Sequence, residues 1–137
     1  MKKTEPGYLF TLPMDVRDYE CDIQGIVNNA AYLQYLEHAR HRFIKTRGLD
    51  FAQLTKQGIH LVVVRSEVDY KSPLRSGDAF TVGLNIERTS LVRFGFLQDI
   101  LRVPDKKLMV RAKVICAAMN DAGKPILPKV VDTLFSK

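Results

Sequence analysis

Residues 18–47 read DYECDIQGIVNNAAYLQYLEHARHRFIKTR, and this stretch decides the fold. An acid-rich segment with one glycine leads into two asparagines, and neither glycine nor proline occurs again before Gly48. Asparagine is a preferred N-cap, and glycine is a preferred residue just beyond a helix C-terminus. The pattern therefore predicts one long helix that begins at Asn28 or Asn29, runs to about Arg47 and stops at Gly48.

The expected helix carries one continuous stripe of mostly apolar residues. Its members recur at intervals of three and four residues, which is the spacing of one face of an α-helix. The stripe is broad enough to lie in the hollow of a curved sheet. It consists of Leu33, Leu36, Arg40 and Phe43, flanked by Tyr32, Ala39 and Ile44.

Alternating apolar residues on either side of the helix predict five strands. One precedes the helix, over residues 8–16, where Pro13 indicates an edge strand or a bulge because proline lacks a backbone donor. Asp50 is expected to cap a short helix that ends at Gly58, and Pro128 is expected to begin a short terminal helix. The other strands cover residues 60–70, 80–86, 92–100 and 108–116, joined by turns at 72–78, 88–90 and 104–107.

One strand, one long helix and four strands joined by tight turns define an α+β fold in a single domain, residues 1–137. Consecutive hairpins favour an antiparallel sheet, and the helix has to cover its apolar face. A sheet covered by one helix keeps exposed edges and an exposed outer face. We therefore expect the chain to associate with itself.

The composition fits a folded globular domain. Hydrophobic residues make up 46% and charged residues 26% of the chain, which excludes a disordered protein. The longest apolar runs, such as residues 61–64, are too short to span a bilayer, and the N-terminus lacks the apolar stretch of a secretory signal. Cys21 and Cys116 are the only cysteines, which is typical of a reducing compartment, so we expect a cytoplasmic protein.

A net charge of +6 bears on the choice of partner. The basic residues are scattered, so no nucleic-acid-binding arm stands out, and no strand motif interleaves aromatic with basic residues as an RNA-binding sheet would. An excess of this size usually reflects a solvated surface, and it also attracts ligands that carry phosphates. We expect a small-molecule ligand and no nucleic acid.

Three motifs, spread over most of the chain, carry a resemblance to a known family. Residues 22–40 follow D-x-x-G-x-V-x-N-x-x-Y-x-x-Y-L-E-x-A-R, residues 68–78 follow V-x-Y-x-x-P-L-x-x-G-D, and residues 90–94 read SLVRF. The chain resembles the hotdog-fold thioesterases, in the branch related to 4-hydroxybenzoyl-CoA thioesterase. The resemblance implies a curved antiparallel five-stranded sheet wrapped around one long central helix. It also implies a homodimer with its active site at the subunit interface, or a homotetramer built as a dimer of dimers.

The resemblance assigns a chemical role to the acid-rich loop. Hydrolysis of a thioester needs a nucleophile, or a base for water, together with donors that stabilise the oxyanion. In the family the motif acid is the nucleophile or general base, and a backbone amide further along the motif binds the carbonyl oxygen. Here these groups are Asp22 and the amide of Asn29, and Gly25 lets the backbone turn tightly between them. The dipole of the helix favours both functions.

Two positions depart from the pattern of some relatives, which carry histidine where Asn29 stands and tyrosine where Asp18 stands. Asparagine can orient a water or a carbonyl but does not shuttle protons, so a histidine-assisted mechanism is not expected. The residues leave open whether the Asp22 carboxylate attacks the thioester itself or activates water. Without a catalytic role, Asp22 would be an ordinary capping or turn acid.

The other reactive residues of this motif have simpler interpretations. Alternation turns Cys21 to the face opposite the motif acid, which predicts a small buried side chain rather than a thiol nucleophile. Asp18 and Glu20 are interpreted as solvated acids at the end of a strand. His38 and His41 lie three residues apart on the helix, but no third ligand has suitable spacing, so no metal site is expected.

Substrate contacts are predicted from the family and from chemistry. Tyr32 is placed in an acyl pocket, because an apolar tail needs apolar walls, with Tyr35 and Phe43 as further candidates and core packing favoured for Phe43. The phosphates of coenzyme A call for cationic side chains. The turn that holds Ser90 and Arg93 corresponds to the family's pantetheine and nucleotide contacts. Three nearby cations are interpreted as surface charges: Lys71, Arg75 and Arg88.

The predicted activity is hydrolysis of an acyl-CoA thioester to a free carboxylic acid and coenzyme A, with no cofactor other than the coenzyme A of the substrate. Two alternatives stay open. An acyl-ACP thioesterase would use the same carboxylate on a protein-borne thioester, and a non-catalytic module would bind acyl-CoA without turnover. A dehydratase of the same fold would need a histidine-acid pair at the site, which the Asp22 segment lacks.

Overall fold

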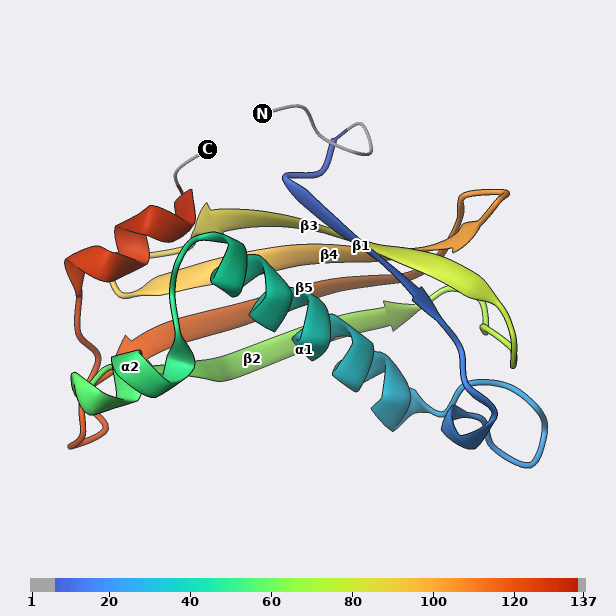
Figure 1. Ribbon diagram of the computed structural model, residues 1–137, viewed down its shortest axis with the longest axis horizontal. Helices are drawn as coiled ribbons and strands as arrows, with labels where there is room; N and C mark the ends of the chain where they lie inside the picture. The colour runs from blue at the N-terminus through green and yellow to red at the C-terminus, as the bar shows by residue number, and fades with distance from the viewer. Residues whose placement is uncertain (1–6, 136–137) are drawn as a thin grey trace.

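A five-stranded antiparallel sheet forms the body of the protein, and one long helix crosses one of its faces (Figure 1). The computed structural model describes residues 7–135. The helices are α1 (Asn29–Thr46) and α2 (Phe51–Lys56), with short 3-10 helices η1 (Asp18–Glu20) and η2 (Lys129–Phe135). The strands are β1 (Phe10–Asp15), β2 (His60–Tyr70), β3 (Ala79–Arg88), β4 (Arg93–Val103) and β5 (Lys107–Met119), in the spatial order β1-β3-β4-β5-β2. The predicted α+β class, the five strands and their antiparallel pairing are confirmed.

The ends of α1 follow from its capping residues. Asn28 is the N-cap, because its Oδ1 accepts a hydrogen bond from an amide of the first turn at 2.9 Å, so Asn29 is the first helical residue. The helix ends at Thr46, and Gly48 follows with a φ of 78°, a conformation that favours glycine. The second helix, α2, begins at a similar cap, Asp50. These positions confirm the predicted helix bounds.

One side of α1 packs into the curve of the sheet, and most of the predicted stripe is buried there. Leu33 is the exception, since it is 45% exposed. Leu33, Arg40 and Ile44 share one flank of the helix, because they lie close to whole turns apart. That flank is buried at Arg40 and Ile44 but open at Leu33, near the helix N-terminus. The prediction for Leu33 is therefore wrong.

The two edge strands carry the irregularities of the sheet. Pro13 lies on β1, which within residues 7–135 pairs only with β3, so proline falls on an edge strand as predicted. On β2 the register with β5 shifts between Val63 and Arg65, which leaves Val64 as a bulge. Val63, beside the bulge, is 48% exposed. The edge formed by β2 is therefore open and partly apolar.

Aromatic residues pack α1 against the sheet at two positions along the helix. Near the helix N-terminus Tyr35 packs on Phe80, with ring centroids 4.7 Å apart, and further along Phe43 packs on Phe96 at 6.2 Å. All four side chains are buried. These contacts hold the first turn of α1 in a defined place beside the loop that precedes it. Among residues 7–135 no helix is long and apolar enough to cross a membrane.

Candidate active site

The acid-rich segment between β1 and α1 forms a tight loop. Cys21 and Val27 pair across it as an isolated antiparallel bridge. The Asp22 amide donates to the Ile26 carbonyl at 2.8 Å, and the Gly25 amide donates to the Asp22 carbonyl at 2.9 Å. Gly25 has a φ of 81°, a region in which residues with a Cβ are strained. The backbone therefore turns tightly at Gly25, as the sequence predicts.

The Asp22 carboxylate is held by its own loop. Its Oδ1 accepts hydrogen bonds from the amides of Gln24 at 2.9 Å and Ile26 at 3.4 Å. Within residues 7–135 no donor lies within hydrogen-bonding distance of Oδ2. The side chain is exposed and borders a cleft of about 460 Å³. One carboxylate oxygen is therefore fixed, and the other is available to a ligand.

The first turn of α1 opens into the same cleft. Asn28 holds this turn in place, because its backbone amide and its Nδ2 both donate to the Glu20 carbonyl at 3.0 Å. Asn29 lines the cleft, and in the described part of the chain its amide has no hydrogen-bond acceptor. Free amides and the helix dipole make such a terminus favourable for negative charge. The carboxylate and the amide singled out by the motif thus border one cleft.

The far wall of the cleft comes from the end of β2 and the segment after it, residues 70–73, and Tyr32 of α1 joins them. The Tyr32 hydroxyl accepts a hydrogen bond from the Leu74 amide at 2.9 Å, and the rings of Tyr32 and Tyr70 lie 5.5 Å apart. Lys71, interpreted from sequence as a surface charge, stands in this wall. Residues 70–73 fall within the second sequence motif, so that motif could have predicted their position at the site.

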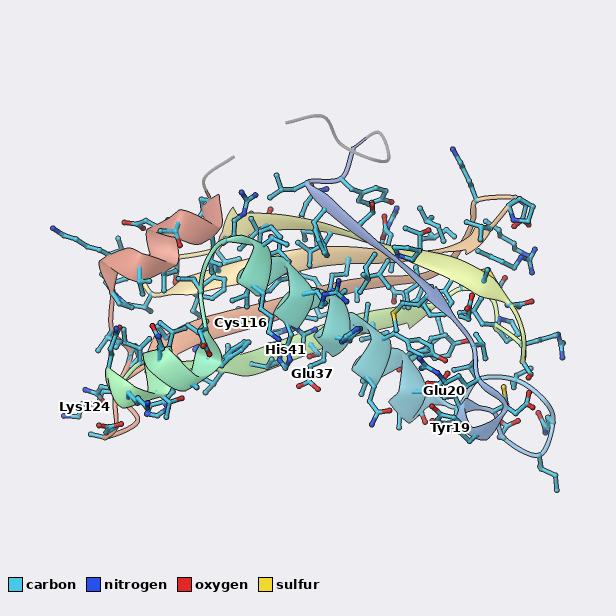
Figure 2. All side chains as sticks on the ribbon, viewed as in Figure 1. Tyr19, Glu20, Glu37, His41, Cys116 and Lys124 are labelled. Atoms are coloured by element: carbon cyan, nitrogen blue, oxygen red, sulfur yellow. The ribbon has the colours of Figure 1, made fainter. Side chains whose placement is uncertain are left out.

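Glu20 connects the loop to the core of the protein through hydrogen bonds. Its Oε1 accepts hydrogen bonds from the buried Tyr35 hydroxyl at 2.7 Å and from the Arg17 amide at 2.9 Å. Figure 2 shows Glu20 where η1 meets the first turns of α1. Burial, together with the bond to Glu20, raises the pKa of the Tyr35 hydroxyl, so the hydroxyl remains the donor. The Glu20 side chain is only 12% exposed, so its interpretation as a solvated acid is wrong.

Ser90 and Arg93 lie away from this cleft within one chain. Both belong to the turn between β3 and β4, where the Ser90 amide donates to the Arg93 carbonyl at 3.3 Å. The start of β3 lies near the Asp22 loop, because the preceding Arg75 bridges to Ile26. The 10 residues of β3 then carry the turn about 30 Å away, to the opposite end of the sheet (Figure 1). Contact with a substrate in the cleft would need a second copy of the chain.

Cys21 is the other potential nucleophile of the loop. It is partly buried and packs against the core, in line with the prediction. Burial, with the neighbouring Asp18, Asp22 and Glu20, raises the pKa of its thiol, so the thiol stays protonated at neutral pH. In the part of the chain that the structure describes, no group of three His, Cys, Asp or Glu side chains could hold a metal ion.

Comparisons with known proteins indicate the family and the fold of the chain. Residues 16–134 match the model of the thioesterase-like superfamily. The acyl-acyl carrier protein thioesterase ATL3 of Arabidopsis thaliana is 34% identical over 89% of this chain and 65% of its own length. The acyl-CoA thioesterase YbgC of Haemophilus influenzae is 26% identical over 92% of this chain and 93% of its own. The crystal structure of Slr0204, a 1,4-dihydroxy-2-naphthoyl-CoA thioesterase from Synechocystis, has a TM-score of 0.86 at 24% identity, covering 91% of this chain and 93% of that one.

The chain belongs to the thioesterase-like superfamily. The likeness to Slr0204 confirms the hotdog fold, with its curved antiparallel sheet around one helix. The family match confirms the resemblance carried by the three motifs. The chain spans 65% of the length of the Arabidopsis relative, a little under two thirds.

Proposed function

We propose that this protein hydrolyses acyl-CoA thioesters to a free carboxylic acid and coenzyme A. The observation that carries the proposal is a pair of groups that border one cleft and have no hydrogen-bond partner within residues 7–135, Oδ2 of Asp22 and the amide of Asn29. The first is a nucleophile or base and the second is a donor for an oxyanion, which are the two groups that thioester hydrolysis needs. Membership of the thioesterase-like superfamily supports the same reaction.

Each step of the proposed reaction has a residue in the cleft. The Asn29 amide donates a hydrogen bond to the thioester carbonyl oxygen and so polarises the carbonyl carbon. Asp22 either removes a proton from an attacking water, or attacks the carbon itself through Oδ2 to form an anhydride that water then opens. The C–S bond breaks, and the proton released from water passes to the thiolate. This thiolate leaves readily because its conjugate acid has a pKa of roughly 8–9.

The carrier of the acyl group is proposed to be coenzyme A. Its phosphates are attracted to cationic side chains, and Lys71 places one in the cleft wall. Acyl carrier protein is the alternative, favoured by the name of the Arabidopsis relative. The ratio of kcat/KM for acyl-CoA and acyl-ACP with the same acyl chain separates the two carriers.

We propose that two copies of the chain complete the site as a homodimer, with a dimer of dimers as the alternative. Asp22 is exposed in the single chain, and Ser90 and Arg93 lie far from it. Within residues 7–135 no strand pairs with the outer side of β2, where Val63 and Tyr70 are 48% and 49% exposed. A second copy docked at this edge would cover these side chains and close the cleft. Light scattering of the purified protein measures the assembly.

Release of free thiol from a panel of acyl-CoAs tests the proposed reaction. Asp22→Asn and Asp22→Ala are expected to lose about 100-fold or more in rate, the size of effect that follows removal of an essential base or nucleophile. Asp15→Asn is the matched control, because Asp15 is exposed at the end of β1 and does not line the cleft. Acyl-CoA binding without thiol release from any member of the panel would instead indicate a non-catalytic module.

A further inference from the structure

Tyr32 of α1 brings a buried hydroxyl group to the Asp22 cleft. Its side chain lines the cleft but is only 4% exposed. The hydroxyl oxygen accepts a hydrogen bond from the Leu74 amide at 2.9 Å, and Leu74 directly follows Pro73 of the cleft wall. Within residues 7–135 the hydroxyl makes no hydrogen bond as a donor. Buried polar groups normally have their hydrogen bonds satisfied, so this O–H calls for an acceptor that a ligand in the cleft can supply.

Two features place this hydroxyl beside the first turn of α1. Tyr32 follows Asn29 by three residues, and a helical side chain points back over the turn on its N-terminal side. Leu74 also contacts both segments, because its amide donates to Tyr32 and its carbonyl accepts from the Val27 amide at 2.9 Å. Val27 and Asn29 line the same cleft. The hydroxyl of Tyr32 and the amide of Asn29 therefore lie at the same end of the helix and border one cleft.

The Tyr32 hydroxyl keeps its proton at neutral pH. Burial raises the pKa of Tyr32 above its usual value, and the bond from the Leu74 amide opposes this shift only in part. A protonated phenol is a hydrogen-bond donor. The bond from Leu74 also fixes the position of the oxygen before any ligand binds. Donors that are held in place in this way stabilise an oxyanion without the cost of reorganisation.

We propose that the hydroxyl of Tyr32 is a second hydrogen-bond donor to the thioester carbonyl oxygen, beside the amide of Asn29. The inference rests on the proposed hydrolysis and adds a catalytic residue to it. When the carbonyl carbon is attacked, the π electrons of the C=O bond move to its oxygen, and both donors stabilise the negative charge. These electrons re-form the C=O bond as the C–S bond breaks and the thiolate leaves. Tyr32 donates a hydrogen bond throughout and loses no proton.

The infrared carbonyl band of a bound substrate tests this contact directly. An acyl-CoA with an isotope-labelled thioester carbonyl is bound to Asp22→Asn, which is expected to hold the substrate without turning it over. A hydrogen bond weakens the C=O bond and lowers its stretching frequency, so adding Tyr32→Phe should move the band to higher frequency. Tyr70→Phe is the matched control, because Tyr70 lines the same cleft with a half-exposed side chain, and it should leave the band in place. A band that Tyr32→Phe does not move would overturn the proposal.

Thiol-release kinetics separate this inference from the proposed hydrolysis. Tyr32→Phe is expected to lower kcat about 100-fold with little change in KM, the effect of removing one oxyanion donor, whereas Tyr70→Phe should lower kcat less than about threefold. Full kcat in Tyr32→Phe would overturn the role of Tyr32 and leave the hydrolysis intact. Absence of thiol release from the unmodified protein would overturn the hydrolysis itself.

Two further outcomes distinguish a donor from a structural contact. A fall in kcat without a shift of the carbonyl band would show that Tyr32 acts only by holding Leu74, and would overturn the proposal. If Tyr32→Phe does not fold, fluorotyrosine in place of Tyr32 keeps the hydroxyl and makes it a stronger donor. The carbonyl band should then move to lower frequency, and an unmoved band would contradict the contact.

Discussion

The hydroxyl oxygen of Tyr35 lies 2.7 Å from Oε1 of Glu20 and joins the buried face of α1 to the loop that carries Asp22. The backbone carbonyl of Glu20 also accepts two hydrogen bonds from Asn28, the N-cap of α1. Two anchors therefore set how far the Asp22 carboxylate stands from the first amides of the helix. Loss of either contact should slow the proposed reaction while the protein remains folded.

Tyr35→Phe removes the hydroxyl but keeps the ring in the core. We expect the free energy of unfolding to fall by about 1.5–3 kcal/mol, the range for a hydrogen bond to a charged group. We also expect kcat to fall several-fold with little change in KM, because misplacement of Asp22 affects the reacting geometry more than binding. Tyr19→Phe is the control, since Tyr19 is 78% exposed beside Glu20 (Figure 2). Urea denaturation and thiol-release kinetics measure both; equal kcat in the two variants would contradict the anchoring role.

Asn28→Ala removes the cap that links α1 to the loop. Loss of an N-cap is expected to lower the free energy of unfolding by about 1 kcal/mol. Asp50→Ala is a matched control, because Asp50 caps α2 through its own side chain and does not line the cleft. Both variants should lose similar stability in urea titrations, but only Asn28→Ala should lower kcat. A similar fall in kcat for both would show that the effect comes from stability alone.

Gly25→Ala tests the tight turn beside Asp22. Gly25 has a φ of 81° and Gly123 a φ of 78°, and a Cβ added at either position meets no atom within 4 Å. Each substitution is therefore expected to cost about 1–2 kcal/mol through backbone strain alone. Thermal unfolding should show similar losses, while thiol-release assays should show a lower kcat for Gly25→Ala only. Full activity of Gly25→Ala would show that the proposed reaction does not depend on this turn.

Stability at alkaline pH should depend on Cys116. Burial raises the pKa of its thiol from 9.0 to about 11. Between these values the folded state holds the proton and the unfolded state has lost it, so the free energy of unfolding falls as the pH rises. The fall attributable to this group is at most about 3 kcal/mol. Cys116→Ala should show a shallower loss between pH 9 and 11 in urea denaturation, and an unchanged slope would contradict the assignment.

Local chemistry explains why much of the fold could be predicted. Asn28 and Gly48 mark the ends of α1 through their own side-chain and backbone preferences. The bulge at Val64 could not be predicted, because an extra residue in β2 is defined only by its register with β5. The exposure of Leu33 was missed for a similar reason. Helical spacing places Leu33 on a flank, but the way α1 crosses the sheet decides how much of that flank is covered.

Some features of the candidate site could also be predicted from local sequence, and others depend on how distant segments pack. Asp22 and Asn29 belong to one continuous loop and helix, so the motif could predict that both border one cleft. The bond between Tyr35 and Glu20 depends on how two separate segments pack, which composition and spacing do not encode. The roles of Ser90 and Arg93 stay predictions, because they depend on a second copy of the chain.

A crystal structure with a hydrolysis-resistant acyl-CoA analogue tests the pairing of Asp22 with the Asn29 amide most directly. We expect the carbonyl oxygen of the analogue at about 2.9 Å from the Asn29 nitrogen. We expect its carbonyl carbon at about 3–3.5 Å from Oδ2 of Asp22, or bridged to it by one water. An analogue whose carbonyl group lies outside this cleft, or faces away from Asp22 with its oxygen on other donors, would contradict the proposed chemistry.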